Sequence, residues 1–134
     1  MNLYQEVRTV LAAEDKITAI VGAGVNTRIW SRWPRTYNTP CIVMEIDEDA
    51  ENPDLATGTG DLIISAVTIT CRADTSNGAR ALWALVRSLL AGYAGVFDAV
   101  LDSTGDAEVP KAEGSTEHWY DRVMDFTMFR SEPV

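Results

Sequence analysis

The stretch LIISAVTITCR, residues 62–72, decides the fold, because a second patterned stretch, ARALWALVRSLLAGY at residues 79–93, follows it closely. The first stretch is rich in β-branched residues and predicts a strand. The second predicts an amphipathic helix whose apolar stripe comprises Leu82, Val86, Leu89 and Tyr93, widened by Ala79, Trp83 and Leu90. A helix with one apolar face needs a sheet to cover, so this pair predicts a layer of helix on sheet.

The residues before this unit predict helices and then one more strand. Leu3, Val7, Val10 and Leu11 recur at helical spacing, and a short apolar run at 17–21 ends at Gly22. This pattern fits two short helices or one broken helix. Residues 28–40 contain two prolines and predict an irregular crossing segment, whereas residues 41–47 alternate as a strand. The acidic, turn-rich stretch at 47–61 predicts a connection that makes the two strands antiparallel.

Two further strands are expected downstream, at residues 97–101 and 122–130, joined by a long polar loop at 103–120. The order of elements predicts an α+β fold. We expect a mostly antiparallel four-stranded sheet packed by a long amphipathic helix, with one or two N-terminal helices, in a single domain of residues 1–134.

The composition limits the possible partners. The net charge of −9 over 134 residues argues against a protein that binds nucleic acid by neutralising phosphates. No apolar run approaches the roughly 20 residues of a membrane span. The N-terminal residues MNLYQEV lack the features of a signal peptide, so a cytosolic chain without a membrane partner is expected. Cys41 and Cys71 are predicted to be buried, reduced thiols.

Motifs that could support catalysis or cofactor binding are incomplete. AIVGAGVNTR, residues 19–28, has Thr27 where a dinucleotide-binding loop needs its third glycine. Asp47, Asp49 and Glu51 alternate like a calcium loop, but Asn52 replaces the required glycine, and a solvated loop is favoured over a weak cation site. His118 stands without a nucleophile or a metal motif. We therefore expect no enzyme, no cofactor and no metal site.

Alternating arginine and tryptophan side chains in the crossing segment predict a contact surface. Such residues are common at protein–protein hot spots and also suit stacking on single-stranded bases. The negative net charge favours a subunit or partner interface here, made by Arg28, Trp30, Arg32, Trp33 and Arg35.

Taken in order, the chain resembles the tail-completion or tail-terminator proteins of long-tailed bacteriophages. The resemblance rests on the N-terminal helix, the Arg-Ile-Trp entry at 28–30, the strand PCIVMEI at 40–46 and an acidic loop. It continues through AVTITCRAD at 66–74 and the Ala-rich helix to the closing strand DRVMDFTMFR at 121–130. It covers nearly the whole chain.

The resemblance implies an assembly protein with no catalytic residues to transfer. Members form rings, typically hexamers, that cap the tail tube, stop its polymerisation and present a docking face to the head connector. The expected partners are further copies of the chain, the tail tube protein and the connector or stopper protein. The expected locations are the head-proximal end of the tail in the virion and, during assembly, the host cytoplasm.

The same resemblance suggests a reason for the charge. DNA must pass through such a ring without specific binding, and carboxylates in the lumen would repel it. One of the two acidic loops is therefore expected to line the lumen or to dock on a neighbour. The candidate residues are Asp47, Glu48, Asp49, Glu51 and Asp54 in one loop, and Asp106, Glu108, Glu113 and Glu117 in the other.

Two other functions remain open from the sequence. One is a different head–tail connector or neck component of similar fold, which would bind heads instead of tube ends. The other is an acidic DNA mimic that inhibits a DNA-binding host enzyme, in which a row of carboxylates imitates phosphates.

Overall fold

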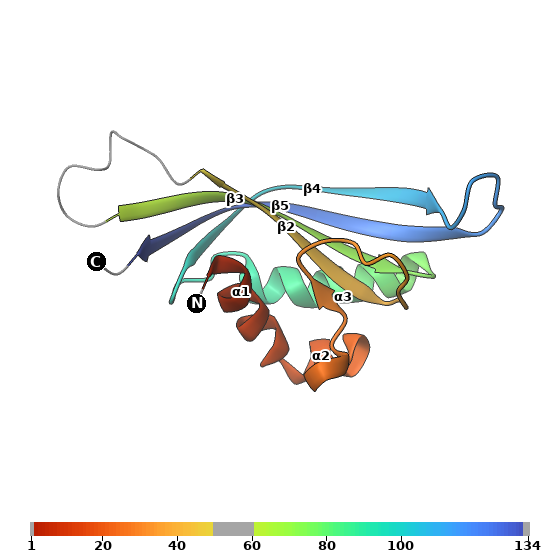
Figure 1. Ribbon diagram of the computed structural model, residues 1–134, viewed down its shortest axis with the longest axis horizontal. Helices are drawn as coiled ribbons and strands as arrows, with labels where there is room; N and C mark the ends of the chain where they lie inside the picture. Colours follow the sequence, from red (N-terminus) through yellow and green to blue (C-terminus); the bar gives the residue numbers. More distant parts are fainter. Residues whose placement is uncertain (1, 50–60, 133–134) are drawn as a thin grey trace.

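The computed structural model describes residues 2–49 and 61–132. All three helices lie on one face of a sheet of long strands (Figure 1). The elements, in chain order, are α1 (Leu3–Ala12), α2 (Asp15–Val21), the 3-10 turn η1 (Gly24–Asn26), β1 (Ile29–Trp30), β2 (Cys41–Asp49), β3 (Asp61–Ala73), α3 (Ser76–Leu90), β4 (Asp98–Pro110) and β5 (His118–Glu132).

The α+β class is confirmed, but the sheet has five strands in the order β1-β2-β3-β5-β4 instead of the expected four. The extra strand is β1, which runs parallel to β2 and pairs only Ile29 with Ile42 and Trp30 with Val43. All other pairings are antiparallel. A two-residue strand has too few positions to show alternation, which is why the crossing segment was expected to be irregular throughout.

The expected long loop at 103–120 is wrong. β4 continues to Pro110 and β5 begins at His118, so only residues 111–117 connect them. The pairing extends to Pro110 opposite His118, with an irregularity between Leu101 and Ser103. Residues 102–108 are all exposed, so this part of the hairpin has no buried face to produce alternation. Backbone pairing and a few polar side-chain contacts maintain it, and hydrophobic periodicity cannot reveal it.

The helices begin and end at recognisable signals. Asn2 caps α1 through a capping box with Gln5, and Thr75 caps α3 by accepting a hydrogen bond from the Gly78 N–H at 3.0 Å. Gly22 ends α2, so the N-terminal region forms two helices, one of the two expected alternatives. α3 buries Ala79, Leu82, Val86 and Leu90, with Leu89 and Tyr93 at the edge of the core.

The main core lies between the helices and one face of the sheet. It is built by alternate residues of the long strands, such as Met44 on β2, Ile69 on β3 and Phe126 on β5. A buried ion pair joins α1 to β5, because the Arg130 Nη2 lies 2.7 Å from the Glu6 Oε1. No described helix has the length and hydropathy needed to cross a membrane.

Candidate docking surfaces

The face of the sheet opposite the helices, here called the open face, is acidic. The helix-facing residues that build the core are mostly apolar, and the alternate positions of the strands carry the carboxylates Glu45, Asp47, Asp98, Asp102 and Asp125. Among the described strand residues of this face, the only cation is Arg72. The open face therefore presents negative charge across three strands, β2, β5 and β4.

Hydroxyl groups hold part of this charge in place. The Thr68 hydroxyl donates to the Asp125 Oδ1 at 2.8 Å, and the Ser103 hydroxyl donates to its other oxygen at 3.0 Å. The Thr127 hydroxyl donates to Asp102 at 2.6 Å. These hydrogen bonds fix the orientation of the Asp102 and Asp125 carboxylates on the open face.

A buried cation lies at one end of the open face. The guanidinium of Arg72 forms two bonds of 2.7 Å with the Asp121 carboxylate and one of 2.6 Å with the Tyr37 hydroxyl. It also lies 3.9 Å from the ring centre of Trp33 and 4.8 Å from that of Trp119. We call Arg72 and these four partners the Arg72 cluster. It fastens the crossing segment to the sheet.

The charges within the Arg72 cluster are strongly coupled. Burial by itself would lower the pKa of Arg72, but the hydrogen bonds and charges of Asp121 and Tyr37 outweigh it and raise the pKa overall. The guanidinium is thus a fixed positive charge whose donors are engaged within the subunit.

Of the five residues expected to form an interface, only some are exposed, and the others make contacts within the subunit. Arg28 donates to the Pro40 and Ile20 carbonyl oxygens at 2.8 Å each, so it ties α2 to the crossing segment, which contains a cis peptide bond before Pro40. Trp30 and Trp33 are half-buried against Tyr37, with ring centres 5.9 and 5.5 Å away. Arg32 and Arg35 are exposed.

The acidic residues lie on strands more than on loops. Asp47, Glu48 and Asp49 belong to β2, and Asp47 is exposed, whereas Glu51 and Asp54 fall outside the described residues. Asp106 and Glu108 extend from β4, and Glu113 and Glu117 lie in the connection; all four are exposed. We call residues 104–120 the acidic hairpin, which reaches past the start of α3 (Figure 1).

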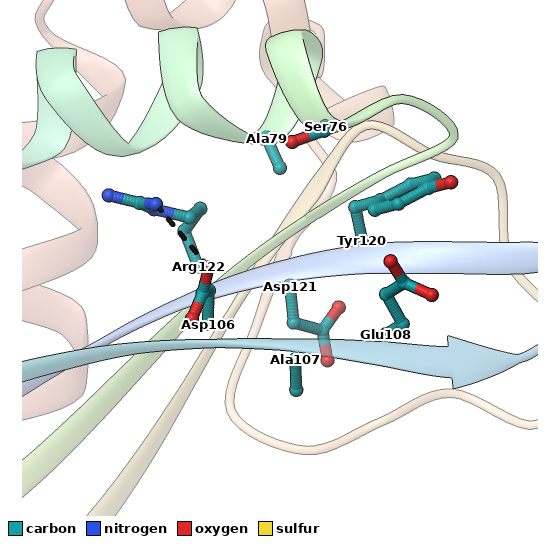
Figure 2. Close-up of a pocket in the computed structure, with 8 residues that line it drawn as sticks. All are labelled: Ser76, Ala79, Asp106, Ala107, Glu108, Tyr120, Asp121 and Arg122. Atoms are coloured by element: carbon teal, nitrogen blue, oxygen red, sulfur yellow. Dashed lines mark ion pairs between the residues drawn. The ribbon is translucent and has the colours of Figure 1, made fainter.

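A shallow hollow of about 350 Å³ lies between the start of α3 and the acidic hairpin, lined by Ser76, Ala79, Asp106, Ala107, Glu108, Tyr120, Asp121 and Arg122. Figure 2 shows Tyr120 and Arg122 directed toward α3, with Asp121 on the opposite side of β5. The Arg122 Nη1 lies 3.8 Å from the Asp106 carboxylate. The lining is mostly polar and charged, and it contains no histidine or cysteine.

Two other features considered in the sequence are His118 and clusters of metal-binding side chains. His118 begins β5, and its Nδ1 lies 3.1 Å from the Thr116 carbonyl oxygen. No group of three or more potential metal ligands occurs among residues 2–49 and 61–132. The sequence did not single out Tyr37, Trp119 or the pairing of Arg72 with Asp121, because these contacts join residues far apart in the chain.

Charged outer faces, a projecting hairpin and a two-layer core together define a small α+β protein with polar, charged surfaces. The chain belongs to the family described as Tail completion protein gp17, whose model matches residues 5–126. It therefore has a structural role in phage tail completion and a place in the tail of the virion.

A solved structure shares the fold. The chain is similar to one in a structure described as "Virion of native gene transfer agent (GTA) particle", at 17% identity and a TM-score of 0.67. The match covers 97% of this chain and 95% of that chain. No curated protein matches the sequence.

Proposed function

We propose that the protein is a tail terminator: a ring-forming subunit that caps the tail tube, ends its polymerisation and presents a surface to the head connector. Membership of the tail completion family over residues 5–126 is the observation on which this proposal rests. The similar chain from a gene transfer agent virion supports the fold needed for such a role.

The distribution of charge favours a ring through which DNA passes. The open face carries fixed carboxylates, and the acidic hairpin adds four more, so either surface would repel phosphates if it lined a lumen. We propose that the acidic hairpin or the acidic end of β2 faces the lumen. A ring structure with both on its outer rim would contradict this part of the proposal.

We also propose that the crossing segment, residues 28–40, contacts another subunit or a partner protein. Arg32 and Arg35 are exposed beside the half-buried Trp30 and Trp33. Replacing both tryptophans with alanine would remove subunit contacts, but it would also loosen the packing on Tyr37. Arg32→Glu with Arg35→Glu is therefore the cleaner test, because neither side chain is needed for the fold.

The experiment that tests the proposed function combines solution mass with binding to tubes. Light scattering over a concentration series and negative-stain images should show closed rings near six subunits, and purified tail tubes should carry the protein at one end. Binding to heads but not to tube ends would favour a neck component instead. A monomer that ignores both and binds a DNA-binding enzyme would favour the DNA mimic and overturn the proposal.

A further inference from the structure

The outward side of α3 differs in charge from the rest of the molecule. No acidic residue occurs between Ser76 and Leu90, and the exposed positions alternate arginine with small side chains. We call this surface the α3 outer face; it consists of Arg80, Ala81, Ala84, Arg87, Ser88 and Ala91. A molecule with nine excess negative charges therefore keeps a cationic strip opposite its acidic face.

The cations of this strip lack partners of opposite charge. Neither Arg80 nor Arg87 has a carboxylate within ion-pair distance in the described part of the chain. Arg87 lies 5.4 Å from the ring centre of Trp83, and Arg122 approaches the same ring at 4.5 Å. Two guanidinium groups, one from α3 and one from β5, thus face the same indole.

A hollow of about 320 Å³ runs along this surface, lined by Trp83, Ala84, Arg87, Ser88 and Ala91. Small side chains allow a backbone to approach closely. An occupant with exposed carboxylates would therefore suit this surface, because it could pair with the exposed Arg80 and Arg87.

The acidic hairpin has the complementary chemistry. Asp106, Glu108, Glu113 and Glu117 are exposed, and its Lys111 already lies 2.9 Å from Asp74. β4 is also an edge strand, so its outer backbone groups remain available. The hairpin extends beyond the core, which lets it reach a neighbouring molecule (Figure 1).

We propose that the α3 outer face of each subunit receives the acidic hairpin of a second copy of the chain. Hairpin and receiving face are different patches, so the contact is heterologous, and repetition around an axis closes a ring. Complementary charge would orient the subunits and reject the reversed arrangement. This inference rests on the proposed ring, and because it places the hairpin in the subunit contact, it leaves the acidic end of β2 as the surface that faces the lumen.

The test uses two full-length variants with reversed charge. The first, Arg80→Glu with Arg87→Glu, makes the receiving face acidic; the second, Glu108→Arg with Glu113→Arg, makes the hairpin basic. Each alone should need at least about tenfold more protein to form rings than the wild type does. An equimolar mixture should restore rings that contain the two variants in equal number, because every contact then joins opposite charges.

Matched controls separate this effect from a general change of charge. Arg8→Glu with Lys16→Glu gives the same charge change on α1 and α2 and should leave ring formation as in the wild type. Circular dichroism and thermal melting establish that each variant is folded. Arg80→Lys with Arg87→Lys keeps the charge and should keep the rings.

The same mixtures are assayed on purified tail tubes, where a tube end can template assembly. Rings that persist with the α3 variant, or a mixture no better than either variant alone, would overturn the inference. Intact rings that no longer bind tube ends would assign the α3 outer face to the tube protein and overturn it as well. If wild-type rings cap tubes and both variants behave like wild type, this inference fails while the proposed function stands; a wild type that neither forms rings nor binds tubes defeats both.

Discussion

Arg72 is the residue whose environment most constrains the open face. The side chains of Arg72 and Asp121 are only 10% and 8% exposed, and the pair joins β3 to β5 beneath two tryptophan rings. A buried ion pair adds little net stability compared with apolar residues, but removing one partner leaves an unpaired charge. The cluster therefore matters most for fixing the position of the crossing segment.

Replacing Arg72 with methionine should lower the free energy of unfolding by about 3–5 kcal/mol, because the Asp121 carboxylate stays buried without its partner. Urea denaturation followed by tryptophan fluorescence measures the change. Arg35→Met removes an equal but exposed charge and should change stability by less than about 0.5 kcal/mol. Equal effects for the two variants would contradict the structural role assigned to Arg72.

The two thiols should be unreactive in the folded protein. Burial raises the pKa of Cys41 to about 12 and raises that of Cys71 as well, and both thiols are free. Only the thiolate is nucleophilic. An aromatic disulfide reagent at pH 8 should therefore modify neither cysteine until denaturant is added, whereas rapid labelling of the folded chain would contradict the burial of both residues.

The raised pKa of Cys41 also makes the free energy of unfolding depend on pH. The unfolded thiols ionise near the ordinary value of 9.0, whereas folded Cys41 keeps its proton up to about 12. This contribution to stability is thus complete below pH 9 and is lost as the pH rises toward 12. A variant with both cysteines changed to alanine should lose less stability across that interval, which urea midpoints at pH 8 and pH 11 would measure.

At the scale of elements, the end of α2 depends on one backbone conformation. Gly22 has φ 88° and ψ 165°, a region essentially restricted to glycine, and an added Cβ would lie 2.9 Å from the Asn26 carbonyl oxygen. Gly22→Ala should therefore destabilise the protein by about 1–3 kcal/mol, measured by urea denaturation.

Gly105 provides the matched control for this change. It lies in β4 without a positive φ, and nothing lies within 4 Å of an added Cβ. Gly105→Ala should change stability by less than about 0.5 kcal/mol. If Gly22→Ala changed stability as little as Gly105→Ala does, this would contradict the positive φ that the structure assigns to Gly22 at the end of α2.

Hydrophobic periodicity predicted the elements that have a buried face. β3, α3 and the half of β5 around Phe126 were found because one side of each enters the core. β1 and the outer half of the hairpin were missed, since β1 is two residues long and residues 102–108 of β4 are all exposed. Among the candidate sites, Arg32 and Arg35 were predicted from residue type and are exposed in the structure, whereas the pairing of Arg72 with Asp121 depends on strand order. Arg80 and Arg87 are seven positions apart with no acid between them, so the cationic side of α3 can be recognised from the sequence.

At the scale of the whole molecule, two electrostatic effects oppose each other in a ring. Subunits with a net charge of −9 repel one another, while the proposed contact between hairpin and α3 attracts them. The screening length falls from about 10 Å at 0.1 M salt to about 3 Å at 1 M. The longer-range repulsion is largely screened at the lower concentration, so further salt acts mainly on the close contact.

Raising sodium chloride from 0.1 M to 1 M should therefore weaken subunit association. Sedimentation velocity at a fixed protein concentration would record a shift from rings toward monomers. Rings that become more stable over this range would mean that repulsion between the acidic faces dominates, and that apolar contacts hold the subunits together.

The position of β5 has a consequence for how the chain is made. Although β5 follows β4 in the sequence, it lies between β3 and β4 in the sheet, and β4 has no other strand beside it among the described residues. A ribosome releases β4 before the strand that must separate it from β3. Until β5 is synthesised, β4 has no partner strand. If it paired with β3 during this interval, it would occupy the place of β5 in the sheet. Residues 102–108 of β4 are exposed and mostly polar, which lowers the tendency of this strand to pair prematurely with β3.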